Sequence, residues 1–125
     1  MTDKTAAEKA RIKPGTTIAV LNRVPEVVES MGLPDDVAFV EPGVAQLVFL
    51  FASTQAELEE QMPPAVAGLA PGAAIWVLFR KGSKAAGFDM NRDSVWAIAE
   101  RLDMRPLGLV GVDGTWSAFR LRPAR

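Results

Sequence analysis

The stretch QLVFLFA, residues 46–52, decides how this chain folds. Apart from Gln46 it is apolar throughout, and it is too short for a helix that buries every side. A strand has this composition when both faces of its sheet are covered, as in a parallel α/β sheet. A second run of the same kind, AAIWVLF at 73–79, follows after one helix-length segment. Together they predict a right-handed βαβ unit.

The elements before this unit are expected to be short. Residues 1–13 are polar and Ala-rich, and they form either a short docked helix or a tail. Residues 16–22 read as the first strand, and residues 37–40 as a brief second one. Between them, Pro25 suits the first position of a helix of about two turns.

The helix inside the βαβ unit carries two opposing signals. Thr54 and Glu57 match a capping box, in which the hydroxyl and the carboxylate each satisfy a backbone amide at the helix start. Pro63 and Pro64 lie in the middle of the same segment, remove two amide donors and disfavour helix at the residue before them. We therefore expect the helix to kink or restart near Met62.

The chain is expected to close with a helix and an antiparallel hairpin. Asn91 is a suitable N-cap for the helix. Residues 107–112 and 116–121 flank Asp113-Gly114, which is a strong two-residue hairpin signal. The nearby glycines, Gly108 among them, indicate close packing and a turn.

The composition narrows the function classes. A chain of 125 residues is long enough for one domain, which we expect to span residues 1–125. A formal net charge of −1 supplies no general attraction to phosphate backbones or anionic lipid, so we expect neither nucleic acid nor a membrane as partner. The chain has no Cys and no His. This excludes thiolate and Ser-His-Asp catalysis and removes the commonest metal ligands, so we expect no metal site.

The sequence contains no recognisable secretory signal or membrane span, so the cytoplasm is the default location. The N-terminus carries Asp3 and Glu8 early and lacks the apolar core of a secretory signal. No apolar run approaches the roughly 18 residues of a membrane span. We therefore expect a cytoplasmic protein.

The order of elements resembles the core of class I S-adenosylmethionine (SAM)-dependent methyltransferases. The residues that carry this likeness are the Lys-Pro-Gly approach to the first strand at 13–15, the Ala-Pro-Gly turn at 70–72, and the terminal hairpin. The resemblance implies a three-layer, Rossmann-like α/β domain with a six-stranded, mostly parallel sheet of order 2-1-3-4-6-5. One βα repeat is missing between the second and third strands.

The whole chain also resembles a small bacterial family of unknown function. The segments that carry this second likeness are AEKARIKPG at 7–15, AELEEQMP at 56–63, the RKGSK loop at 80–84 with Asp89 beyond it, and VDGTWSAFRL at 112–121. This resemblance covers nearly all of the chain and implies no activity.

The chain departs from the methyltransferase pattern where the cofactor would bind. In a working enzyme the first strand opens into a Gly-rich loop, because only glycine lets the backbone approach the cofactor closely. Here NRVPE at 22–26 contains no glycine, and Pro25 has no amide to offer. We therefore expect the cofactor-binding motif to be lost or heavily rebuilt, which favours a domain without a bound cofactor.

Ligands of open parallel sheets lie beyond the carboxyl ends of the strands, near the point where the strand order reverses. That rule selects Asn22, Glu41 and Ser53 as the candidate cofactor-binding residues. Glu41 follows the second strand, where nucleotide-binding folds place an acid that binds ribose hydroxyls. Alternatively, it is a solvated residue of the turn before Pro42.

The same rim carries a candidate anion site and two candidate ligand contacts. Arg80, Lys81 and Lys84 place three cations within one loop, which suits a phosphate or carboxylate but is not a P-loop. Alternatively, the loop only aids solubility. Asp113 and Trp116 lie near this edge as well. Trp116 either stacks on a ligand or packs against the sheet.

Three functional hypotheses follow. The first is a non-catalytic or degenerate methyltransferase-like domain that binds an anionic small molecule or a protein partner. The second is a small enzyme that binds SAM or a nucleotide, with Glu41 on the ribose and Lys81 or Lys84 on an anionic group. The third is an assembly module that pairs through its edge strands or exposed helices.

Overall fold

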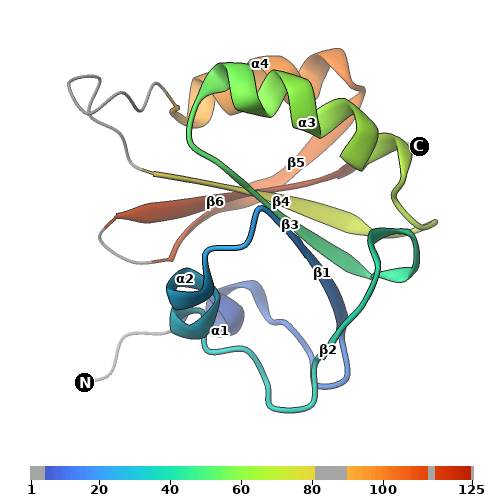
Figure 1. Cartoon of the computed structure of the whole chain (residues 1–125), viewed down its shortest axis with the longest axis vertical. Coiled ribbons are helices and arrows are strands. Elements are labelled where there is room, and N and C mark those ends of the chain that lie inside the picture. The colour runs from blue at the N-terminus through green and yellow to red at the C-terminus, as the bar shows by residue number, and fades with distance from the viewer. Residues whose placement is uncertain (1–4, 81–89, 113–114, 125) are drawn as a thin grey trace.

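The protein is one six-stranded sheet with helices on both faces (Figure 1). The structure is a computed structural model that describes residues 5–80, 90–112 and 115–124. Its strands are β1 (Thr17–Leu21), β2 (Ala38–Phe39), β3 (Leu47–Ala52), β4 (Ala74–Arg80), β5 (Met104–Gly111) and β6 (Trp116–Pro123). Its helices are α1 (Ala6–Ala10), α2 (Pro25–Ser30), the 3-10 turn η1 (Pro42–Val44), α3 (Gln55–Ala67) and α4 (Arg92–Arg101).

The strand order is β2-β1-β3-β4-β6-β5, as the sequence predicts. Strands β2, β1, β3 and β4 pair in parallel, and β6 pairs antiparallel with both β4 and β5. Helices α3 and α4 lie on one face of the sheet, and α1 and α2 on the other (Figure 1). The predicted Rossmann-like α/β fold is confirmed.

The core is centred on β3 and β4. All six residues of β3 are buried, and so are the five inner residues of β4. Alternate side chains of β3 point to opposite faces: Phe49 packs with the residues of α1 and α2, whereas Leu50 packs with those of α3 and α4. On the α1/α2 face the Phe49 ring lies 5.0 Å from that of Trp76. The apolar run at 46–52 therefore fills both layers of the core.

Helix α3 corrects one expectation. It runs unbroken from Gln55 to Ala67 through Pro63 and Pro64, so of the two alternatives the restart near Met62 is wrong and the kink stays a prediction. Both prolines are exposed, whereas Leu58, Met62 and Ala65 are buried against the sheet. The two lost hydrogen bonds therefore lie on the solvent side, and packing of the buried stripe holds the helix together across them.

The N-terminal elements are short and docked. Helix α1 begins at the N-cap Thr5, whose side chain and that of Glu8 form a capping box, and it ends at Arg11 in the left-handed region (φ 58°). Ala6 is fully buried, so this segment is a docked helix and not a tail. Helix α2 starts with Pro25 at its first position, as predicted.

The link from β2 to β3 is unusually short for two parallel strands. Such strands normally need a crossover of about a dozen residues, usually a helix. Here residues 40–46 make the connection, and η1 is their only helical turn. Strand β2 itself is a two-residue edge strand with both residues exposed. No helix in the described part of the chain is long and apolar enough to cross a membrane.

Candidate functional site

The strand order reverses between β1 and β3, and this is where a ligand of an open parallel sheet is expected. Leu21 and Leu50 are cross-strand partners, so the two strands end side by side. Asn22 directly follows β1, and Ser53 directly follows β3. The fold therefore brings these two predicted residues to one place.

Asn22 connects the end of β1 to β3 and to α3 by side-chain hydrogen bonds. Its backbone is left-handed (φ 56°), a conformation that asparagine tolerates better than most residues. Its side-chain Nδ2 donates to the carbonyl oxygen of Phe51 at 3.1 Å and also to Oε1 of Gln61. One amide therefore ties β1 to β3 and to helix α3.

The polar groups that follow β3 are also used internally. The Thr54 hydroxyl accepts from the amide of Glu57 at 3.1 Å and caps α3. The Glu57 carboxylate accepts from the amide of Ser53 at 3.3 Å. The N-cap predicted at Thr54 is therefore confirmed, but the capping box is not, because the Glu57 carboxylate bonds the Ser53 amide at the reversal point and not the amide of Thr54.

A pocket of about 510 Å³ opens beside Asn22 on the α3 side of the sheet. It is lined by Leu21, Asn22, Pro42, Leu50, Glu60, Gln61, Pro64, Ala65 and Gly68. Glu60 is the only charged residue of this lining. Glu41, the third predicted residue, immediately precedes Pro42, and its side chain is exposed. All three candidate cofactor residues therefore lie at or next to this rim.

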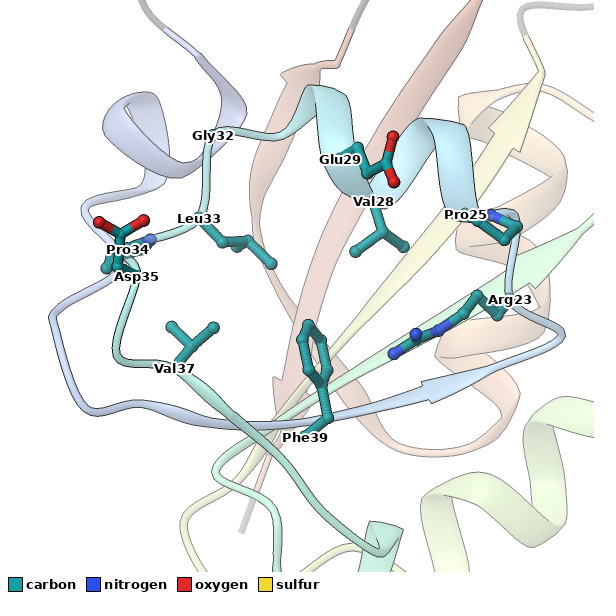
Figure 2. Close-up of a pocket in the computed structure, with 10 residues that line it drawn as sticks. All are labelled: Arg23, Pro25, Val28, Glu29, Gly32, Leu33, Pro34, Asp35, Val37 and Phe39. Carbon is teal, nitrogen blue, oxygen red and sulfur yellow. The ribbon is translucent and has the colours of Figure 1, made fainter.

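Arg23 does not line the pocket beside Asn22 but a second one, of about 360 Å³, between α2 and β2. Figure 2 shows the apolar side chains of Val28, Leu33, Val37 and Phe39 converging on it. The Arg23 guanidinium lies over the Phe39 ring, 4.7 Å from its centroid. The two consecutive residues after β1 therefore line pockets on opposite faces of the sheet.

The remaining candidates divide between described and undescribed residues. Arg80 ends β4, and its guanidinium lies over the Trp116 ring at 5.2 Å. Trp116 is 5% exposed and meets the Phe51 ring edge-on at 5.4 Å, so it packs against the sheet. Lys81, Lys84 and Asp113 lie outside the described residues. The ligand roles of all five stay predictions.

Charge is distributed unevenly in a way that the sequence motifs did not reveal. No Lys or Arg occurs between Arg23 and Arg80. The acids in that interval are Glu26, Glu29, Asp35, Asp36, Glu41, Glu57, Glu59 and Glu60. The segment from α2 through α3 is therefore acidic. Its nearest cations along the chain are Arg23, which follows Asn22 and lies over Phe39 of β2, and Arg80 at the end of β4. No group of three carboxylates among the described residues could hold a metal ion.

Sequence reasoning also missed Gln61, whose side chain anchors Asn22. A signal was present, since Gln61 directly precedes the buried Met62 on the helix. A polar side chain beside an apolar stripe often has a partner within the protein. Its partner could not be named from the sequence, because it lies 39 positions away.

Comparison with solved structures identifies the fold. The ribosomal protein L11 methylase of Lactobacillus delbrueckii subsp. bulgaricus matches at 11% identity with a TM-score of 0.57, over 96% of this chain and 75% of that one. The tRNA methyltransferase TrmK of B. subtilis matches at 10% identity with a TM-score of 0.57, over 98% and 67%.

A third solved structure, LepI in complex with SAM, matches at 13% identity with a TM-score of 0.56. The match covers 94% of this chain and 38% of LepI. No protein-family model and no curated protein matches the chain. The likeness to a bacterial family of unknown function and the missing βα repeat therefore stay predictions. The chain has a Rossmann-like fold similar to that of class I SAM-dependent methyltransferases, and this resemblance is confirmed for the fold alone.

Proposed function

We propose that this chain is a non-catalytic, methyltransferase-like domain that binds an anionic small molecule or a protein partner at the rim formed by the carboxyl ends of its strands. One observation carries the proposal. The polar groups where the strand order reverses are hydrogen-bonded within the protein. The side-chain amide of Asn22 donates to the Phe51 carbonyl and the Gln61 side chain, and the backbone amide of Ser53 donates to the Glu57 carboxylate.

The start of α2 supports the same conclusion. Nucleotide sites of this fold type use backbone amides at the start of the helix that follows the first strand. In this chain Pro25, at the first helical position, has no amide to donate, and the N-cap Val24 makes no side-chain cap. With only six residues, α2 also offers a weak dipole.

Charge indicates which part of the rim an anion would reach. Residues 24–79, which include Glu41 and Glu60, contain no cation, and Arg23 before them lies over Phe39 in the pocket beside β2. Arg80 begins the cationic loop that continues through Lys81 and Lys84. A carboxylate or phosphate is attracted to this loop and repelled by the acidic segment. The anionic ligand is therefore assigned to the end of β4.

The second candidate, a SAM- or nucleotide-binding enzyme, is favoured by the pocket beside Asn22. Its volume of about 510 Å³ falls within the range of small-molecule sites, roughly 300–1,000 Å³. Its only charged lining residue, Glu60, suits a neutral or cationic compound better than a polyphosphate. If this pocket takes a ligand, S-adenosylhomocysteine should bind better than ATP.

Heteronuclear NMR titration separates the two candidates. The ligands are S-adenosylhomocysteine, NAD and ATP, each taken to millimolar concentration. The proposal expects saturable amide shifts around Arg80 with the phosphate-bearing ligands and none at Asn22, Glu41 or Ser53. Saturable shifts at those three residues with S-adenosylhomocysteine would contradict it and favour the enzyme.

An Asn22→Gly variant sharpens the titration. It removes the side-chain amide that bonds Phe51 and Gln61, and it supplies the glycine that a cofactor loop requires. Binding of S-adenosylhomocysteine by this variant but not by the native chain would support a role of Asn22 in preventing binding. Equal binding by both chains would contradict it.

A further inference from the structure

Three arginines of the terminal hairpin share one face of the sheet. Arg105 on β5 and Arg122 on β6 are direct cross-strand partners, so their side chains point to the same side. Arg120 lies two residues before Arg122 and shares that side. Ala118 and Trp116, which continue the same alternation, pack with the residues of α1 and α2. The arginines therefore lie on the α1/α2 face.

The pairing of Arg105 with Arg122 is unfavourable in the free protein. Like charges directly opposite one another on neighbouring strands repel. Both side chains are exposed. Neither makes an ion pair or a side-chain hydrogen bond with any residue that the structure describes. A pair of this kind is relieved when an anion lies between the two guanidinium groups.

Arg120 supplies a third cation whose position is fixed. Its Nη2 donates to the carbonyl oxygen of Leu107 at 3.3 Å, and its Nε is buried without a hydrogen-bond partner. The guanidinium lies against Gly108, where an added Cβ would come within 2.9 Å of Nη2. Gly108 also has a φ of +139°, which favours glycine. The backbone thus holds this group on the same face of the sheet as the exposed pair.

We propose that Arg105, Arg120 and Arg122 form a binding site for a small multivalent oxyanion, such as a compound with a diphosphate group. Guanidinium groups offer forked donors that match the oxygens of phosphate. The site lies at the end of β6, which runs antiparallel to β4, so it is at the opposite end of the strands from Arg80 and Asn22. It is therefore distinct from the rim of the proposed function.

Thermal unfolding in dilute buffer, with inorganic pyrophosphate as the probe, tests the site. A ligand that binds only the folded state raises Tm in a saturable manner. We expect a rise of about 4 °C or more at saturation, beyond that produced by sodium chloride at matched ionic strength. A response equal to that of sodium chloride would overturn the proposal.

The double variant R105Q/R122Q locates the effect. It should weaken the calorimetric Kd for pyrophosphate by at least about tenfold, because each substitution removes a charge-assisted hydrogen bond. Without pyrophosphate its Tm should equal or exceed that of the native chain, since the repulsion is gone. Arg92→Gln, a change at an exposed arginine of α4, is the matched control and should leave the Kd unchanged. An unchanged Kd in the double variant would refute the site.

The source of the phosphate is tested separately. A short single-stranded RNA should compete with pyrophosphate only weakly, because the cluster is confined to three residues of one hairpin. Tighter binding of the RNA than of pyrophosphate, lost in R105Q/R122Q, would overturn the assignment to a small molecule and point to a nucleic-acid backbone.

Discussion

Strand β3 at the centre of the sheet buries all six of its residues, whereas both residues of β2 at the edge are exposed. Among the residues that the structure describes, the exposed large apolar side chains lie in or next to the two edges of the sheet: Phe39, Val44, Leu107 and Leu109. Stability depends on buried apolar area, so it is concentrated in the centre. The edges contribute less, and the pocket beside β2 and the arginines proposed as an anion site on β5 and β6 both lie there.

The strongest way to break this comparison is to place a charge in the centre. Phe49→Asp should unfold the protein, since an unpaired charge in a buried strand costs several kcal/mol against a total stability of about 5–15 kcal/mol. Circular dichroism should show no cooperative melting. A native melting curve would mean that β3 is not an interior strand.

Matched truncations at the centre and at the edge measure the difference directly. Phe49→Ala should cost about 3–5 kcal/mol, because the ring is fully buried against Trp76. Phe39→Ala should cost about 1 kcal/mol or less, because that side chain is 49% exposed and its contact with Arg23 is a surface cation–π interaction. Urea denaturation gives both values. Equal costs would show that β2 is as much part of the core as β3.

Substitutions at Asn22 test the junction between centre and rim. Asn22→Ala should cost about 1–3 kcal/mol, since it removes the bonds to Phe51 and Gln61 and leaves a left-handed alanine. Asn22→Gly should cost less, because glycine adopts that φ freely. Chemical denaturation of the two variants side by side separates the cost of the lost hydrogen bonds from the cost of the left-handed backbone. If glycine costs as much as alanine, the backbone conformation contributes nothing.

The smallest effect is expected in the segment that follows β4, for which the sequence predicts a surface loop. Lys81 and Lys84 changed together to Ala should then leave the free energy of unfolding within about 0.5 kcal/mol of the native value. Thermal melting checks this. A large loss of stability would show that Lys81 and Lys84 contribute to the fold, which would contradict a role limited to anion binding.

Much of the fold could be predicted from short stretches of sequence. The runs at 46–52 and 73–79 identify the buried parallel strands, because a run that is apolar almost throughout and too short for a buried helix is typical of a strand covered on both faces. The caps at Thr54 and Asn91 were correct because a cap depends on residues within one turn. The strand order followed from the resemblance to methyltransferases and from the hairpin signal at the end of the chain.

The error in α3 shows where local reasoning fails. Proline propensity predicts a break near Met62, yet the helix continues because Met62 and Ala65 pack on the sheet while both prolines face solvent. The free energy of that packing exceeds the loss of two hydrogen bonds. Helix propensity describes an isolated segment and does not include the packing of this helix on the sheet.

The sequence by itself determined the α/β class, the interior strands, the helix starts and the absence of a glycine loop after β1. Each of these depends on neighbouring residues. Only the tertiary structure decided that Asn22 bonds to Phe51 and Gln61, and that Arg105, Arg120 and Arg122 gather on one face. These groupings join residues far apart in the chain, and such proximity is set by strand register and helix packing rather than by local composition.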